Sequence, residues 1–389
     1  MTEDRGVKET MRFPGKTEAV IRDLSSFVDS PEIPGAKALF ALTDAAIAAM
    51  EGESAAIRPR SADGRPGGLI QIDRPWTLVI PDLHARGGFF LGILRSRLAE
   101  LPGASVLDLV LQGRLGLLCL GDVPHSEGGL AARRWSRAAL RRLDDPGPEG
   151  ILNPFMEEEM RLSLGALALV MRLKVLLGDG FHCLKGNHDN LSNSAEDGDL
   201  PFYKYALEGS MGAEWLELRY GREGLGSLRR YELLLPLAAR GRSFCASHAE
   251  PAVSFGYGDI LEYRKNPRLV RALIWTGNGE ALPRAVEKSL VSLLPSNPRP
   301  DTLRWISGHR PVAGSYALRA GGKLVQIHNP ERNQAALLRE DDHSVPMRIS
   351  IVELDGSGSV LRQAVLVPPL EEDEREDAKG LNPQGASRA

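Results

Sequence analysis

The chain of 389 residues has little of several features that would place it in a specialised class. No apolar run approaches the roughly 18 residues that cross a bilayer, so the sequence predicts no membrane partner. Three cysteines are too few, and odd in number, for a secreted disulfide framework. The net charge of −3 lacks the basic excess of many nucleic-acid-binding proteins. The amino terminus has acidic residues and no apolar signal segment, so we expect a cytoplasmic protein.

Apolar residues make up 42% of the chain, which is enough for a large core. We expect helices over 18–28 and 36–50, and a linker rich in proline and glycine over 58–68. The predicted organisation is therefore an N-terminal extension and linker (1–68), a main domain (69–367) and a disordered acidic tail (368–389). Within the main domain, helical insertions are expected near 126–180 and 190–230, including a helix over 202–220.

Asp82 and His84 follow directly after the short apolar run that ends at Ile80. Side chains two residues apart at the end of a strand point the same way, so both can face one point beyond the strand. A carboxylate and an imidazole that converge are suited to a divalent metal. One such pair is common by chance and is weak evidence alone.

The same pattern recurs downstream, where four more short apolar runs stop at residues that can bind a metal. These stops are Gly121-Asp122, Gly186-Asn187-His188-Asp189, His248 and Gly308-His309. Glycine allows a close approach of the backbone to a ligand. Loops after the carboxyl ends of strands are where open α/β sheets place their sites. The sequence therefore predicts one site assembled from five loops.

These five blocks, in this order, resemble those of the calcineurin-like metallophosphoesterases. Two stretches are similar to the phosphoprotein phosphatase branch, which contains the serine/threonine phosphatases: 231–248, before and including His248, and Leu273 to Thr276. The resemblance covers about residues 69 to 330. It implies an α/β fold, a two-sheet sandwich with helices outside, and hydrolysis of a phosphate ester by a metal-activated hydroxide.

The resemblance also implies two divalent metal ions. Asp82, His84 and a bridging Asp122 would hold one ion, and Asn187, His248 and His309 would complete the site of the other. Imidazoles with few carboxylates favour Mn, Fe or Zn over Mg or Ca. His188 would not bind metal but would protonate the leaving oxygen, since its unperturbed pKa is near neutral pH.

The chain departs from the family after Asp122. His125 stands where the phosphoprotein phosphatases have an Asp that orients the catalytic His, and Ser126 stands where they have a phosphate-binding Arg. His125 and Asp189 are the candidates to orient His188. Arg310 and Arg284 are the candidates to bind phosphate, because arginine binds it bidentately. The missing Arg puts protein phosphatase activity in question.

The remaining histidines are less clear. His182 and His343 are interpreted as structural or exposed, and His328 is equally compatible with a structural role and with a place in the site. The substrate is a small-molecule or protein phosphate ester. A nucleotide or dinucleoside-polyphosphate hydrolase on the same scaffold, and a non-catalytic metal-binding scaffold, are the alternative functions.

Overall fold

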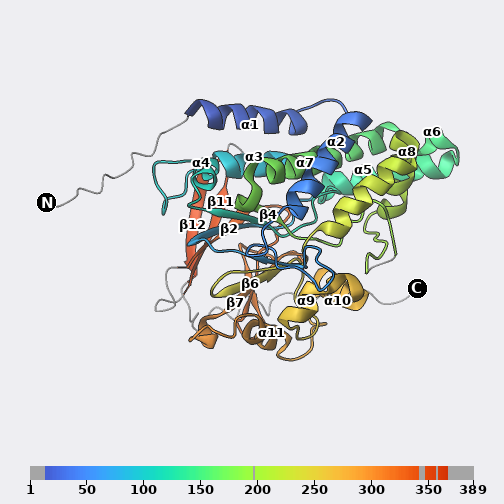
Figure 1. Cartoon of the computed structure of the whole chain (residues 1–389). Helices are drawn as coiled ribbons and strands as arrows, with labels where there is room; N and C mark the ends of the chain where they lie inside the picture. The colour runs from blue at the N-terminus through green and yellow to red at the C-terminus, as the bar shows by residue number, and fades with distance from the viewer. Residues whose placement is uncertain (1–13, 196–197, 341–346, 356–357, 367–389) are drawn as a thin grey trace.

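The computed structural model describes residues 14–195, 198–340, 347–355 and 358–366. Two six-stranded sheets pack against each other, and helices cover the outer face of each sheet (Figure 1). The two-sheet α/β sandwich predicted from the sequence is thereby confirmed. The predicted acidic tail, 368–389, and His343 lie outside the described residues.

The first sheet has the strand order β12-β11-β10-β2-β3-β4. Its β2, β3 and β4 run parallel, whereas β10, β11 and β12 are antiparallel to their neighbours. Its strands are β2 (Trp76–Ile80), β3 (Gly116–Cys119), β4 (Phe181–Cys183), β10 (Gln334–Arg339), β11 (Arg348–Leu354) and β12 (Val360–Leu366).

The second sheet has the order β1-β5-β6-β7-β9-β8, with β6, β7 and β9 parallel. The antiparallel pair β8 and β9 forms a hairpin around Gly321, whose φ is 64°. The strands are β1 (Leu69–Gln71), β5 (Ala238–Arg240), β6 (Phe244–Ser247), β7 (Arg304–Ser307), β8 (Ala317–Arg319) and β9 (Leu324–Gln326).

Strict alternation of side chains fixes the layers. In β2, Leu78 and Ile80 face the core beneath the large helices, while Val79 faces the core shared by the two sheets. Leu117 and Leu118 of β3 divide in the same way. Successive strand residues point to opposite faces, and both faces are covered here, so these strands are apolar throughout.

Eight helices lie on the first sheet's side of the sandwich and three lie on the other, within the described part of the chain (Figure 1). The first group is α1 (Pro14–Val28), α2 (Ala36–Glu51), α3 (Gly87–Arg95), α4 (Val106–Leu111), α5 (Gly129–Asp144), α6 (Pro148–Ile151), α7 (Pro154–Leu177) and α8 (Glu208–Leu234). The second is α9 (Tyr257–Leu261), α10 (Pro267–Ile274) and α11 (Ala285–Leu293). No described helix is long and apolar enough for a membrane crossing.

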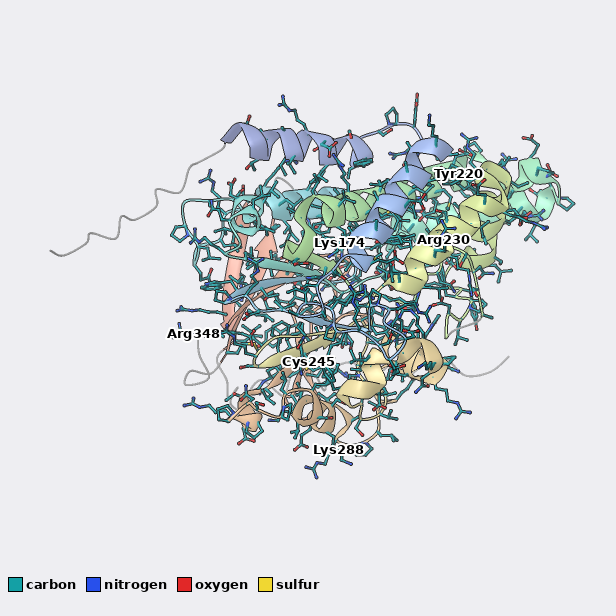
Figure 2. The ribbon with its side chains drawn as sticks, viewed as in Figure 1. Lys174, Tyr220, Arg230, Cys245, Lys288 and Arg348 are labelled. Carbon is teal, nitrogen blue, oxygen red and sulfur yellow. The ribbon has the colours of Figure 1, made fainter. Side chains whose placement is uncertain are left out.

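The N-terminal extension packs onto the main domain. Helix α2 contacts both α7 and α8, and its Leu39 and Met50 join the core beneath these helices. Figure 2 labels Tyr220 on α8, whose hydroxyl donates a hydrogen bond to the Pro34 carbonyl at 2.7 Å. The linker is also anchored, because Arg58 is fully buried and donates to the Leu234 carbonyl.

A buried cluster of charged groups joins the extension to β4. Glu53 lies 3.3 Å from Arg58, binds Lys174 of α7 (labelled in Figure 2), and lies 3.0 Å from His182 of β4. Burial raises the pKa of Glu53, but its hydrogen bond with His182 and the charges of Lys174 and Arg58 outweigh burial and lower it to about 2. Glu53 is therefore the counter-charge for two buried cations. The structural role predicted for His182 agrees with this position.

The segment before α8 differs from expectation. The predicted helix over 202–220 begins only at Glu208, and residues 201–207 form an irregular segment. The carboxylate of Glu208 accepts hydrogen bonds from the backbone N–H groups of Lys204 and Tyr205, which holds this segment in a non-helical path. Phe202, within this segment, packs on His125 and His188 at the site described next.

Candidate metal centre

Six loops meet where parallel strands of the two sheets end. Each loop carries a side chain that can bind a metal, one to four residues after the last residue of its strand. These residues are Asp82 after β2, Asp122 after β3, Asn187 after β4, His248 after β6, His309 after β7 and His328 after β9. The five predicted blocks are thus brought together, and a sixth joins them.

Asp82 is fully buried and connects the two sheets. Its Oδ2 accepts a hydrogen bond from the backbone N–H of His309 at 2.8 Å. Its Oδ1 has no hydrogen-bond partner among the described residues. A Cβ added to Gly308 would lie 1.8 Å from this oxygen, so glycine is required there. A buried carboxylate oxygen without a donor is costly unless a cation neutralises it.

Asp122 lies between imidazoles that follow strands of the two sheets. Its backbone is left-handed (φ 48°), and its Oδ1 accepts the backbone N–H of His188 at 2.7 Å. Its Oδ2 lies 3.7 Å from Nε2 of His84 and 3.4 Å from Nε2 of His248. One carboxylate oxygen therefore faces imidazoles that come from different sheets.

Backbone carbonyls fix the tautomers of His84 and His248. Nδ1 of His84 donates to the carbonyl of His125 at 2.9 Å, and Nδ1 of His248 donates to that of Leu120 at 3.1 Å. Burial lowers the pKa of His84 to about 3 and that of His248 well below its usual value. Both rings are neutral, with the Nε2 lone pair directed toward Asp122. Metal-binding histidines commonly have this outer hydrogen bond.

Around His248 two electron-pair donors, its own Nε2 and Oδ1 of Asn187, face each other without a proton between them, and Nδ1 of His309 lies next to them. Nε2 of His248 lies 3.0 Å from Oδ1 of Asn187 and 3.2 Å from Nδ1 of His309. Because Nδ1 of His248 carries the ring proton, Nε2 has none to donate to the amide oxygen. A cation placed between these atoms removes the repulsion, and the mixed nitrogen and oxygen set is suited to Mn, Fe or Zn.

The carboxylates are poised to accept positive charge. Burial raises the pKa of Asp82 to about 6, and burial together with the nearby Asp82 and Asp189 raises that of Asp122 well above its usual range. The cause in both is the removal of charge from water. A divalent cation would stabilise the ionised carboxylates and leave the neutral imidazoles as ligands.

His188 lies beside the six strand-end residues, and its ring packs between other aromatic rings. Its ring centroid is 4.3 Å from that of Phe202 and 5.0 Å from that of His84. Its Nδ1 has no hydrogen-bond partner in the described chain. The ring centroid of His125 lies 5.6 Å away, and neither nitrogen of that buried ring has a hydrogen-bond partner among the residues described. The structure thus brings His125 next to His188, as expected. No hydrogen bond joins the two rings within the described part of the chain.

Asp189 has a different role from the one predicted. Its carboxylate accepts hydrogen bonds from the backbone N–H groups of Gly186 at 2.7 Å, Asp122 at 2.8 Å and Val123 at 3.1 Å. These bonds lock the loops after β3 and β4 to each other. Asp189 therefore positions the loops that carry Asp122 and Asn187, and the prediction that it orients His188 directly is corrected.

The two predicted phosphate-binding arginines differ in placement. Arg284 is exposed and pairs with Glu287 at 2.7 Å at the start of α11, so the structure does not bring it to the centre. Arg310 is exposed and follows His309. Burial and then the charge of Arg310 lower the pKa of His309 to about 3, so Arg310 lies near the centre.

Two residues of the centre, Glu127 and Lys204, were missed by the sequence analysis, which left the role of His328 undecided. Glu127 lies 3.4 Å from Nε2 of His84 and 2.9 Å from Nε2 of His328, and Lys204 binds its other oxygen. His328 had a usable signal, because it follows an apolar strand by two residues, as Asp82 does. Lys204 had none, since only the irregular path of the segment before α8 places it there.

A narrow pocket beside the centre collects polar atoms without partners. It is lined by His84, His125, Ser126, Glu127, Trp135, His188, Lys204, Tyr205 and Glu208. Among the described residues, Oγ of Ser126, Nε1 of Trp135 and the ring nitrogens of His125 have no hydrogen-bond partner. Buried polar atoms of this kind call for a bound oxygen ligand or water.

Comparison with known proteins gives distant structural likenesses. No protein-family model matches the chain, and no curated protein matches its sequence. A protein serine/threonine phosphatase structure from Saccharomyces cerevisiae is 15% identical, with a TM-score of 0.49, over 85% of this chain and 95% of that one. A cold-active protein tyrosine phosphatase of a psychrophilic Shewanella is 11% identical, with a TM-score of 0.43, over 77% of this chain and 82% of that one.

The sandwich and the order of the strand-end loops in this chain are those that the resemblance to the calcineurin-like metallophosphoesterases implies.

Proposed function

We propose that the protein is a dinuclear metal-dependent phosphoesterase. The observation that carries this proposal is the convergence of Nε2 of His248 with Oδ1 of Asn187 and Nδ1 of His309, beside a carboxylate of Asp122 that faces imidazoles from both sheets. Asp82 and His84 would hold one ion, Asn187, His248 and His309 the other, and Asp122 both. Two divalent ions bound there would neutralise the phosphate and lower the pKa of a water molecule to supply hydroxide.

In this proposal His188 is the general acid. Its backbone is fixed by the hydrogen bond to Asp122, and its ring nitrogen Nδ1 is free of protein partners in the described residues. The ring is therefore held next to the ligands. Burial lowers the pKa of His188 well below its usual value, so it would give a proton to a leaving oxygen only once a bound phosphate anion raises that pKa. His125 lies beside it and, with Phe202, limits how its ring can turn.

Lys204 is the proposed cation for the substrate phosphoryl group. It lines the pocket with His84 and His188. Glu127 holds it there and, despite the opposing effect of burial, keeps its pKa raised, so the ammonium stays charged. The guanidinium of Arg86 donates its hydrogen bonds to backbone carbonyls, including that of Asp82 at 2.8 Å, so it is a weaker candidate for phosphate binding. Ser126 stands where the phosphoprotein phosphatases have a phosphate-binding Arg. The ammonium of Lys204 can take over that role, as a point charge rather than a bidentate partner.

The cover over the centre favours a small substrate. Phe202 is 5% exposed and packs on both His188 and His125. A phosphorylated side chain of a folded protein would meet Phe202 on its approach to His188. A small phosphomonoester needs far less space, so we place small-molecule phosphate esters ahead of phosphoproteins.

The test combines metal content with a substrate panel. The purified protein is loaded with Mn²⁺, its metal is counted by mass spectrometry, and hydrolysis of phosphomonoesters, phosphodiesters, nucleotides and phosphopeptides is followed. We expect about two ions per chain and turnover of a small phosphomonoester. A preference for nucleotides would select the alternative hydrolase, while absence of both bound metal and turnover would show a non-catalytic scaffold and refute the proposal.

A further inference from the structure

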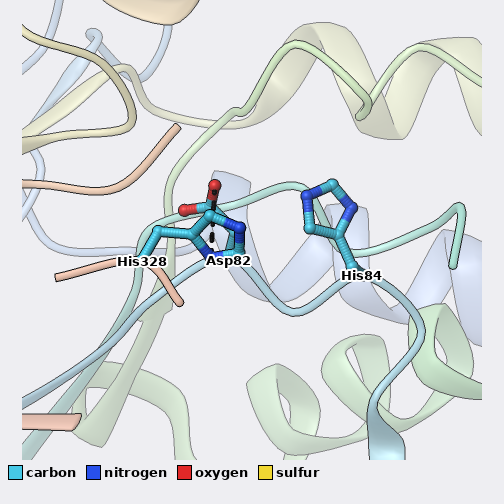
Figure 3. A group of neighbouring side chains, drawn as sticks. All are labelled: Asp82, His84 and His328. Atoms are coloured by element: carbon cyan, nitrogen blue, oxygen red, sulfur yellow. Dashed lines mark ion pairs between the residues drawn. The ribbon is translucent and has the colours of Figure 1, made fainter. Parts of the chain in front are cut away.

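His328 repeats, from a sixth strand, the placement of the predicted ligands. It follows β9 by two residues, the same spacing as Asp82 after β2 and His309 after β7. It is fully buried, and its ring centroid lies 5.4 Å from that of His84. In Figure 3 a dashed line joins Asp82 to His328, and the ring of His84 lies to one side of this pair.

We propose that Nδ1 of His328 is a further protein ligand of the ion held by Asp82, His84 and Asp122, and that Glu127 orients its ring. The inference rests on the proposed metal centre and adds to it a residue outside the five-block pattern. It gives that ion two imidazole nitrogens and two carboxylates.

The hydrogen-bond pattern of the ring assigns its tautomer. Nε2 of His328 lies 2.9 Å from Oε2 of Glu127, a carboxylate that can only accept when ionised. The ring proton therefore sits on Nε2, and Nδ1 carries the lone pair. A carboxylate on the outer nitrogen of a histidine whose inner nitrogen is free is the arrangement that raises ligand basicity at metal sites.

The free nitrogen is aimed at the centre. Nδ1 of His328 lies 3.8 Å from Oδ2 of Asp82 and has no hydrogen-bond partner within the described residues (Figure 3). Ligand atoms at about 2.0–2.2 Å from a common ion lie roughly 3–4 Å apart. Ligand atoms of Asp82, His84 and His328 all lie within 4.8 Å of one another. Without an ion, Nδ1 is a buried acceptor next to another acceptor, which is costly.

Glu127 extends this arrangement to the cover of the site. Its other oxygen binds Lys204, from the irregular segment before α8. The segment that covers His188 is thus connected through one carboxylate to a metal-binding imidazole. Neutralising Glu127 should weaken metal binding, because Nε2 of His328 would lose its carboxylate partner.

The test distinguishes which ring nitrogen of His328 binds the metal ion. In His328→Asn the side-chain carbonyl can occupy the place of Nδ1, whereas in His328→Gln the carboxamide reaches the place of Nε2. Mn²⁺ binding is measured by equilibrium dialysis in competition with a chelator. Co²⁺ absorption serves as a second readout of the ligand set, and thermal unfolding verifies folding. His182→Gln is the matched control, since His182 is also buried but is held by Glu53 away from the centre.

We expect wild type and His182→Gln to bind two Mn²⁺, and His328→Gln to bind one of them at least 100-fold more weakly. His328→Asn should recover part of that loss, and Glu127→Gln should weaken the same ion by about 10–100-fold. Two ions bound with unchanged affinity in His328→Gln would overturn the inference but leave the proposed function intact. No Mn²⁺ bound by wild type would overturn both, and equal losses in His328→Asn and His328→Gln would overturn ligation through Nδ1.

Discussion

Replacing His188 by Asn separates the chemical step from metal binding. The backbone N–H of His188 is held by Asp122, and its ring is packed between Phe202 and His84, so the loop should keep its shape when the ring is shortened. Removal of a general acid costs about 10²–10⁴-fold in kcat, which corresponds to roughly 2.7–5.4 kcal/mol of transition-state stabilisation. That loss applies where the leaving oxygen is basic and must be protonated.

The assay compares leaving groups at constant metal content. An alkyl phosphate should show the full loss in His188→Asn, while 4-nitrophenyl phosphate, whose leaving oxygen is stable as an anion, should lose much less. A weaker version of this dependence is expected for His125→Ala, because His125 packs beside His188. Equal losses for both substrates would remove the general-acid role. Loss of one metal ion from His188→Asn would instead make His188 a ligand, since its ring also lies within ligand distance of His84 and Asp122.

Three further outcomes follow from the same geometry. Asp122→Asn should abolish turnover and lower bound metal, measured together, and full occupancy at the wild-type rate would show that Asp122 does not bridge. Lys204→Ala should raise KM by about 10–150-fold, which is the equivalent of one charged hydrogen bond. Lys204→Arg should recover part of this loss in affinity. A larger rise in KM for Arg310→Ala would assign phosphate binding to Arg310. Glu53→Gln should lower the free energy of unfolding by about 3–5 kcal/mol in urea titrations, because Lys174 loses its buried counter-charge. Since the pKa of Glu53 is lowered to about 2, the wild-type advantage should be present above pH 4.5 and disappear as pH falls toward 2; a difference that stays constant with pH would contradict this.

The site could be predicted where its residues are set by local sequence. Asp82, Asp122 and His309 each follow an apolar strand within three residues, and the carboxyl ends of parallel strands meet at one edge. The order of the strands in the sheets could not be derived from these short runs. That order was not needed to locate the site. The motifs themselves, in their order, located the edge.

The wrong predictions concern residues whose positions depend on contacts between distant parts of the chain. Asp189 is next to His188 in sequence, yet its carboxylate is taken by the N–H groups of a loop 66 or 67 positions away. Arg284 follows the tryptophan block but pairs with Glu287 on its own helix. Glu127 and Lys204 meet because the segment before α8 is not helical, and the apolar spacing of that segment predicted the opposite.

Two glycines have a consequence for recognising relatives of this chain. A methyl group on Gly308 would lie 1.8 Å from the free oxygen of Asp82, and one on Gly186 would lie 2.2 Å from Oδ1 of Asp122. Alanine at either position would displace a carboxylate without changing any ligand residue. A related sequence that keeps all the proposed metal-binding side chains but has lost one of these glycines is therefore expected to bind metal poorly.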